Sequence, residues 1–443
     1  MADDRDSDPE DELREILREL LSGQGGVDPA RLMASAGMPS DPESIARLMA
    51  QLQGAMSGAA TGTGIDWKFA TEQARTIASR SSFTPTDRQR SDLDQALHVA
   101  SLWLDEVTGV SELASAPQLM TRVEWIEKTM PFWSQLAEPV AESIAEALTA
   151  VLREQAPEEM TSMLGDVSRM VRGVGGTLFA VQLGQVVGQL SAEVVSGGDV
   201  GIPLLEERAA LLPQNLAAFS EGLDIADDQV ALYLAVRELA HARLFRHARW
   251  LRLQLVSAIR DFAHGISIDT SKIEELAADF DPSNPESLRS ALTSGALIPP
   301  KTPEQQAALA RLETTLALVE GWVDVVTAQA TARLPKSEAI AETVRRRRAS
   351  GGPAEHAFAT LVGLELRPRR LREASRMWQI VGDSLGAERR DDLWSHPDLL
   401  PSSADIDDPD AFVQRLQNPP AADDVDQAIE DLLRDADDRP IED

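Results

Sequence analysis

The sequence predicts a mainly α-helical protein with little or no β-sheet. From Asp66 to about Leu400, apolar residues recur at spacings of three and four, which is the period of a helix with one buried face. Alternating apolar and polar runs, which would indicate strands, are rare, and the best of them starts at Gly265. Aromatic residues make up only 4% of the 443 residues, so we expect aliphatic side chains and alanine to fill the core.

Composition divides the chain into three parts. Residues 1–65 are rich in Gly, Ser, Met and acidic side chains, and we expect this region to be weakly ordered. Residues 66–400 form the predicted helical domain. Residues 401–443 form an acidic tail with fourteen acidic residues against three arginines, which we expect to be largely disordered.

Charge and composition exclude several classes of function. The net charge of −31 argues against a nucleic-acid surface, because phosphate binding needs clustered cations. The chain has no cysteine, and therefore no disulfide and no thiolate metal site. The N-terminus lacks an apolar signal segment, and no uninterrupted apolar run reaches about 20 residues. We therefore expect a cytoplasmic protein with no membrane contact.

Two local patterns have structural interpretations. Small residues stand at every fourth position of 176–188, which predicts a groove where another helix backbone comes close. The run Arg345-Arg346-Arg347-Arg348, followed by glycines, is typical of a solvated helix C-terminus, where cations face the negative end of the helix dipole.

Two predicted helices carry the ionisable side chains of interest. In the helix over 229–246, Arg237, Glu238 and His241 stand in the pattern Arg-Glu-x-x-His, which differs from the zinc-binding pattern His-Glu-x-x-His only in its first residue. Arg237 and His241 are four residues apart and share one helix face, with Glu238 beside them.

The second helix begins at a capping box, Thr302-Pro303-Glu304-Gln305, and ends before Pro335. Glu320 lies within an almost wholly apolar run and is therefore expected to be buried. Because an unpaired buried carboxylate costs several kcal/mol, Glu320 should take up a proton, form an ion pair or bind a metal. Asp324 lies on the same face. In such a pair, one carboxylate can bind a metal while the other orients a histidine ligand.

These segments resemble a known family. VRELAHARLFRHARWLRLQL, TPEQQAALARLETTLALVEGWVDVV and RRRRASGGPAEHAFATLVGLELRPRRLREA are similar to a bacterial family of zincin-like proteins, which are named as hydrolases and zinc-dependent metalloproteases on sequence grounds. The resemblance spans roughly residues 95–415 and implies a multi-helix, zincin-like domain. It also implies a metal-dependent, peptidase-like hydrolase that uses zinc.

The resemblance also implies residue roles. Glu238 would be the general base, and His241 and Glu320 would bind zinc. Asp324 would not bind the metal but would hold one of the ligands in position. Arg237 departs from the motif, because a guanidinium stays protonated and has no lone pair for a metal. One of the usual three protein ligands is therefore missing, which argues against tight zinc binding.

Three hypotheses follow. In the first, the protein is an active metal-dependent hydrolase in which His247 or His264 replaces the missing ligand. In the second, Arg237 replaces the metal by pairing with Glu320 or Asp324, and the protein acts by binding a protein or peptide partner. In the third, the charged residues of the two helices form an ordinary structural ion-pair network. The sequence identifies neither a partner nor an oligomeric state.

Overall fold

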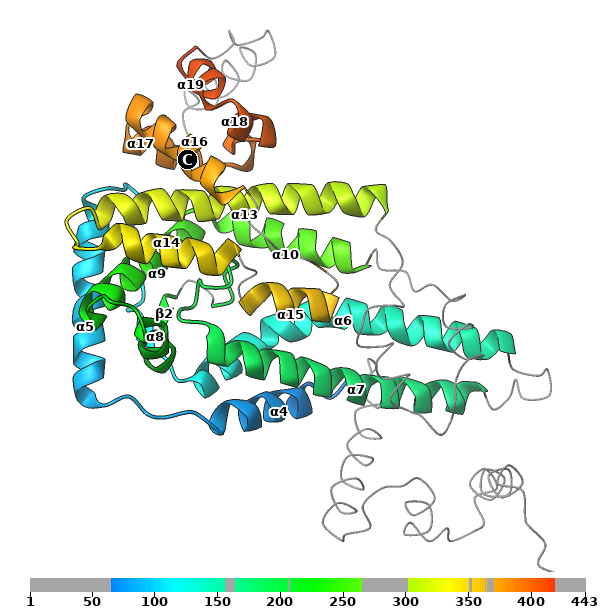
Figure 1. Cartoon of the computed structure of the whole chain (residues 1–443). Helices are drawn as coiled ribbons and strands as arrows, with labels where there is room; N and C mark the ends of the chain where they lie inside the picture. Colours follow the sequence, from blue (N-terminus) through cyan, green and yellow to red (C-terminus); the bar gives the residue numbers. More distant parts are fainter. Residues whose placement is uncertain are drawn as a thin grey trace, which may run out of the picture.

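The predicted mainly α-helical class is confirmed (Figure 1). The computed structural model describes residues 65–155, 164–205, 208–264, 302–349, 353–362, 364 and 370–418. Within these ranges, the only sheet pairs β1 (Gln118–Leu119) with β2 (Ala210–Leu211). The strand-like stretch expected from Gly265, and nearly all of the weakly ordered region expected over 1–65, lie outside the described residues.

The body of the molecule is a stack of helices. Its first half contains α4 (Trp67–Ser79), α5 (Asp87–Asp105), α6 (Arg122–Gln155), α7 (Leu164–Glu193) and α8 (Pro213–Ser220). Its second half contains α9 (Asp227–His247), α10 (Arg249–His264), α13 (Pro303–Ala330), α14 (Ser337–Ala349) and α15 (Pro353–Val362). In Figure 1, α13 crosses the top of this body and α14 runs beneath it.

The small-residue stripe of α7 packs as the sequence predicts. α4 lies along α7, and a Cβ added at Gly184 would stand 2.6 Å from the carbonyl oxygen of Ala70. At Gly188 the added Cβ would meet the carbonyl oxygen of Ala74 at 3.1 Å. Glycine at these two positions is therefore what lets the two helix backbones approach each other.

Helices α9 and α13 form the centre of the core, and they pack against each other. Both are buried on nearly all sides over their middle turns, as expected of helices whose apolar residues do not keep to one stripe. The capping box predicted at Thr302 is present: its side chain accepts a hydrogen bond from the backbone N–H of Gln305, and Pro303 is the first helical residue. Charged residues on these central turns therefore have no access to bulk water.

The strand pair fixes the loop that follows α7. β1 and β2 are parallel, with Gln118 opposite Ala210, and the loop adds backbone hydrogen bonds to β2 from its other side. Gly197 N–H donates to the Ala210 carbonyl at 2.9 Å, and Leu212 N–H donates to the Val195 carbonyl at 3.0 Å. The loop over 194–205, called the α7–β2 loop below, is thereby held against the middle of α9.

A small lobe follows the body (Figure 1). It is made of α16 (Leu371–Leu385), α17 (Ala387–Asp392), η3 (Pro397–Leu399), α18 (Ser403–Asp407) and α19 (Pro409–Gln417). α16 packs on α13 and connects the lobe to the core.

The lobe extends past residue 400, the end of the predicted helical domain. Residues 401–418, expected to belong to a largely disordered tail, form α18 and α19, which bury Ile406, Phe412 and Val413 against the rest of the protein. The high acidic content of this segment concealed a few apolar residues that suffice to dock two short helices.

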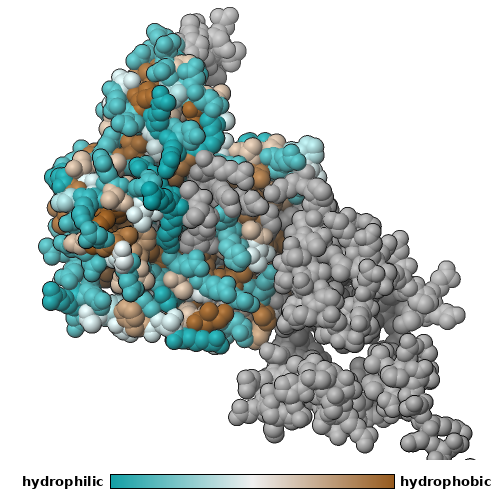
Figure 2. All heavy atoms as spheres, viewed as in Figure 1, coloured by the Kyte–Doolittle hydropathy of each residue, from teal (hydrophilic) through white to brown (hydrophobic). Residues whose placement is uncertain are grey.

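The surface is mixed. The face drawn in Figure 2 is largely hydrophilic, with apolar side chains in separate patches. None of the helices in the described ranges combines the length and hydropathy that a bilayer crossing requires.

Candidate functional site

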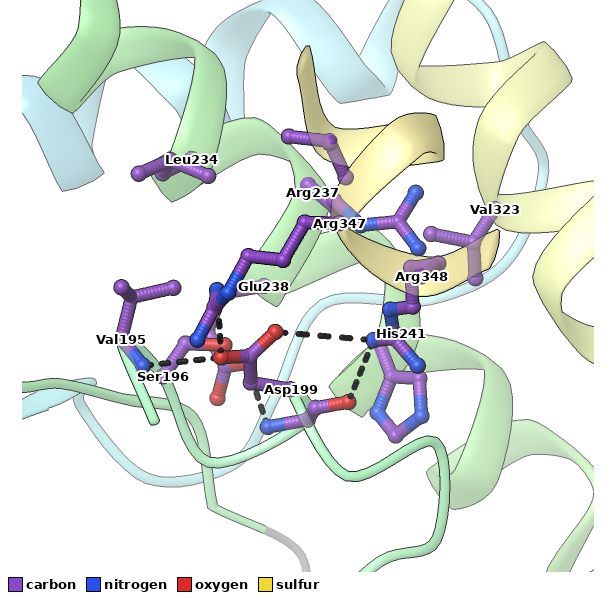
Figure 3. Close-up of a pocket in the computed structure, with 12 residues that line it drawn as sticks. Val195, Ser196, Asp199, Leu234, Arg237, Glu238, His241, Val323, Arg347 and Arg348 are labelled. Atoms are coloured by element: carbon purple, nitrogen blue, oxygen red, sulfur yellow. Dashed lines mark hydrogen bonds and ion pairs between the residues drawn. The ribbon is translucent and has the colours of Figure 1, made fainter. Parts of the chain in front are cut away.

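Arg237, Glu238 and His241 of α9 meet Glu320 of α13 in the core. The C-terminal half of α14 and the α7–β2 loop also contribute side chains, and together these elements surround a cavity of about 10 Å³. That volume has room for about one water molecule. Figure 3 shows Arg237, Arg347 and Arg348 gathered with Asp199, Glu238 and His241 around it.

Glu320 lies between two guanidinium groups. Arg237 Nη2 forms an ion pair with Glu320 Oε2, and Arg348 Nη1 lies 2.9 Å from Glu320 Oε1. The Glu320 side chain is 1% exposed. Burial alone would raise its pKa, but the positive charges of Arg348 and Arg237 outweigh burial and hold the pKa of Glu320 below its ordinary value. Glu320 is therefore ionised, and each of its oxygens faces a cation.

A second buried carboxylate belongs to Asp199 in the α7–β2 loop, a residue that the sequence did not indicate. Arg347 Nη1 lies 2.9 Å from Asp199 Oδ2, and Arg348 Nη2 lies 3.7 Å from Asp199 Oδ1. The backbone N–H of Val195 also donates to Asp199 Oδ2 at 2.9 Å. Burial would raise the pKa of Asp199, but Arg347 and Arg348 together lower it. Arg348 therefore lies between two carboxylates, one from the loop and one from α13.

The four-arginine run is not the solvated helix end that its local pattern predicts. Arg346 fits that interpretation, because its side chain is 77% exposed. Arg348, by contrast, is 11% exposed, and Arg345 and Arg347 also form ion pairs with buried carboxylates. The reason is tertiary: α14 packs on both α9 and α13, where carboxylates from distant parts of the chain need cations.

Asp324 follows Glu320 by one turn but has different partners. Arg345 holds it with Nε at 3.2 Å from both oxygens and Nη2 at 2.9 Å from Oδ2. The hydroxyl of Ser375 donates to the same Oδ2 at 3.1 Å. Of the two carboxylates proposed as partners of Arg237, the structure therefore brings Glu320 to it and pairs Asp324 with Arg345.

Glu238 connects α9 to the backbone of its neighbours. Its Oε2 accepts a hydrogen bond from Gly198 N–H at 2.7 Å, and its Oε1 accepts one from Ala210 N–H at 2.8 Å. Burial raises the pKa of Glu238 to about 7, even though both backbone hydrogen bonds oppose that shift. The side chain thus ties the α7–β2 loop and β2 to the central helix.

His241 lies one turn further along α9 and is buried. Its ring packs against Phe245, with 4.8 Å between the ring centroids, and its Nε2 has no hydrogen-bond partner in the described part of the chain. A Cβ added at Gly198 would stand 2.4 Å from His241 Nδ1, so the loop can approach this closely only with glycine there. Burial lowers the pKa of His241 to about 4, which leaves the imidazole neutral near pH 7.

Neither alternative histidine is brought to this cavity by the described structure. His247 is exposed at the C-terminal end of α9 and is not among the residues that line the cavity. His264 is the last residue of α10, and its side chain lies outside the described part.

The residues around the cavity do not fit a zinc ion. Arg237 offers no lone pair, and the oxygens of Glu320 are taken by Arg237 and Arg348. Only His241 Nε2 remains as a nitrogen ligand, whereas catalytic zinc sites generally have three protein ligands. In the described ranges, no cluster of three or more His, Asp or Glu side chains has a geometry that could hold a metal. A divalent cation here would also be repelled by the guanidinium charges in contact with Glu320.

Comparisons with known proteins place this geometry in context. A family model described as zincin-like metallopeptidase matches residues 65–413. The chain is also similar to a protein from Chloroflexus aurantiacus, whose crystal structure is described as that of a "putative hydrolase with a novel fold". The two share 20% sequence identity with a TM-score of 0.55, over 80% of this chain and 99% of that one, so this likeness concerns the fold. A comparison with curated proteins finds no match.

Proposed function

Because the chain belongs to the zincin-like metallopeptidase family, as its sequence motifs predict, we propose that it is a metal-independent member that binds a peptide segment of a partner without cleaving it. The observation that carries the proposal is the double ion pair at Glu320. Arg237 and Arg348 bring two positive charges to the carboxylate that a zincin would use as a metal ligand. Fixed side-chain cations thus take the electrostatic role of the metal ion.

Charge balance in the cluster supports this function. Three guanidinium groups, those of Arg237, Arg347 and Arg348, face the carboxylates of Asp199 and Glu320. The imidazole of His241 is neutral, and Glu238 is close to half ionised near pH 7. The buried charges are therefore already compensated, and an added divalent cation would leave a large excess of positive charge.

The position of Glu238 points the same way. A general base needs a carboxylate lone pair directed at the attacking water. Each oxygen of Glu238 accepts one backbone hydrogen bond, from Gly198 or Ala210, so half of its lone pairs already hold the neighbouring backbone. In this chain the glutamate of the degenerate motif therefore serves to hold the loop and β2 in place.

A groove beside the site offers a place for a peptide. It has a volume of about 1010 Å³ and lies between α6 and α10; we call it the α6–α10 groove. Buried Phe132, Leu204, Leu205 and Phe245 are among its lining residues, and Phe245 is the residue that packs on the ring of His241. The groove therefore lies against the end of the motif helix, and it is much larger than the cavity at Glu320.

Charge on the α6–α10 groove indicates the kind of peptide. Among the described lining residues, Lys128, Arg208, Arg249 and Arg252 are cationic and Glu127 is the single carboxylate; Arg249 and Arg252 also take part in interactions of their own. Leu253, at the same groove, is 70% exposed and offers an apolar contact at its edge. An extended peptide with acidic side chains and an apolar anchor matches these features. The cationic lining contrasts with the rest of the protein, whose overall charge is −31.

A metal-dependent hydrolase is the competing function. The observation in its favour is His241 Nε2, a buried nitrogen without a partner at the position of a zincin ligand. Zinc titration followed by thermal unfolding separates the two. Under our proposal, zinc and chelator leave the unfolding midpoint unchanged, and a generic unfolded protein substrate is not hydrolysed with zinc present. A zinc-dependent rise in the midpoint, with proteolysis lost in Glu238→Gln, would establish the hydrolase.

The binding half of the proposal has its own test. A displayed library of random decapeptides is selected on the wild-type protein and, in parallel, on the Arg249→Glu/Arg252→Glu variant. We expect the wild type to enrich acidic peptides that the variant does not retain. No enrichment over the variant would leave a structural ion-pair network without a binding function, which is the third hypothesis.

A further inference from the structure

A third concave site lies where α13, α14 and α16 meet, and Asp324 is one of the residues that line it. Its volume is about 480 Å³, within the usual range for small-molecule sites. It shares no residue with the Glu320 cavity or with the α6–α10 groove. We call it the arginine groove, because Arg345 from α14 and Arg372 and Arg376 from α16 all line it.

Positive charge in the arginine groove exceeds what its own carboxylate can neutralise. Asp324 is the only carboxylate among the described residues that line it, and it is already held by Arg345 and Ser375. Arg372 reaches Glu342 outside the groove at 3.6 Å, but Glu342 also binds Arg346 at 2.8 Å. Two exposed guanidinium groups therefore face the groove with little compensating negative charge.

Arg376 is the least compensated of these side chains. Within the described residues it takes part in no ion pair, and its side chain is exposed. It follows Arg372 by four residues, so both guanidinium groups extend from one face of α16, with Ser375 beside them. Two arginines spaced in this way can hold two oxygens of one tetrahedral anion, each through paired N–H donors.

The remaining surface of the groove suits a small polar ligand. Two small side chains line it, Ala328 in the last turn of α13 and Ala332 just after the end of that helix. Gln329 uses its carbonyl oxygen to accept a hydrogen bond from Arg390 at 2.9 Å, which leaves its amide N–H donors for other partners. No aromatic side chain is among the described lining residues, so the groove has no surface on which a nucleobase would stack.

We propose that the arginine groove binds a small phosphate-bearing molecule without an aromatic base, with its phosphate held by Arg372 and Arg376. The Nη1 group of Arg345, which takes no part in its bond to Asp324, adds a third donor at the inner end of the groove. The groove lies beside the Glu320 cluster: Asp324 follows Glu320 by one turn of α13, but none of the residues that line the groove forms an ion pair with Glu320 or His241 in the described structure.

Isothermal titration calorimetry with pyrophosphate tests the proposal. We expect saturable binding of one pyrophosphate per chain, and a loss of affinity of about tenfold or more in Arg376→Gln and in Arg372→Gln. Arg389→Gln is the matched control, since Arg389 is also an exposed arginine but does not line the groove. Because all three side chains are exposed, the thermal unfolding midpoint should stay the same in each variant.

Three outcomes would overturn the proposal. Absence of saturable binding to the wild type is the first. Equal weakening in Arg389→Gln is the second, because it would show only general attraction to positive charge. Equal affinity for citrate is the third, because it would remove the assignment to phosphate.

Discussion

Arg348 Nη1 lies 2.9 Å from Glu320 Oε1 in the interior of the protein, although the two residues are 28 positions apart in the sequence. Arg237 occupies the other oxygen of the same carboxylate. Both oxygens of a glutamate that a zincin would offer to a metal therefore form ion pairs with arginines of the same chain, although Oε1 accepts no hydrogen bond within the described residues.

Removing Arg237 should strongly destabilise the fold. Arg237→Ala leaves the buried carboxylate of Glu320 with one cation fewer, and breaking a buried pair costs about 3–5 kcal/mol. The free energy of unfolding, measured with urea, should fall by about that amount. Arg346→Ala removes an exposed arginine and should change it by no more than about 0.5 kcal/mol. Equal effects of the two substitutions would contradict a buried cluster.

Gly198 should be intolerant of even the smallest side chain. A Cβ at this position would stand 2.4 Å from His241 Nδ1 and 3.0 Å from Glu238 Oε2, so Gly198→Ala forces the loop away from α9. We expect a loss of about 1–3 kcal/mol in unfolding free energy. Gly109→Ala is the control, because nothing lies within 4 Å of its added Cβ. A neutral Gly198→Ala would mean that the loop does not pack on α9 as described.

Stability should depend on pH through Glu238. Burial raises the pKa of Glu238 from 4.5 to about 7, so the stability that its neutral form contributes is complete below pH 4.5 and is lost as the pH rises through 7. Glu238→Gln does not titrate. The unfolding free energy of the wild type minus that of Glu238→Gln should therefore fall between about pH 5 and pH 7.5, by on the order of 3 kcal/mol.

The pKa of His241 also differs between the folded and the unfolded state. Because the wild type and Glu238→Gln both contain His241, its contribution cancels when one unfolding free energy is subtracted from the other. A difference that stays constant or rises with pH would show that Glu238 is ionised throughout in the folded state.

Restoring the zinc motif should require two substitutions. Arg237→His recreates the first motif histidine, but Arg348 still holds Glu320. We therefore expect calorimetry to detect zinc binding by Arg237→His/Arg348→Gln and much weaker or no binding by Arg237→His alone. Arg246→His, which lies on the same helix facing Glu112, should bind no zinc. Tight binding by the single variant would show that Arg348 does not block the site.

Part of the site could be predicted from the sequence, and the reason is local. Glu320 stands in an apolar run, so burial and the need for a partner follow from the sequence, and the motif placed Arg237 as the partner. The positions of Arg348 and Asp199 could not be predicted, because they depend on how α14 and the α7–β2 loop pack on the core. The sequence of a four-arginine run does not distinguish side chains that reach solvent from side chains that pair with buried carboxylates.

The role of Glu238 was hidden for a different reason. Its partners are backbone N–H groups of Gly198 and Ala210, and every residue except proline has such a group. The fold class and the central helices were predictable from apolar spacing. Docking of α18 and α19 was not, since the few apolar residues that bury them are outnumbered by acidic ones.

The central claim is that Arg237 and Arg348 hold the place of a metal ion, and elemental analysis tests it most directly. Protein purified without chelator is analysed for zinc, with Arg237→His/Arg348→Gln purified alongside as the positive control. The account predicts far less than one zinc per wild-type chain and a clear gain in the double variant. Zinc close to one per chain in the wild type would contradict it.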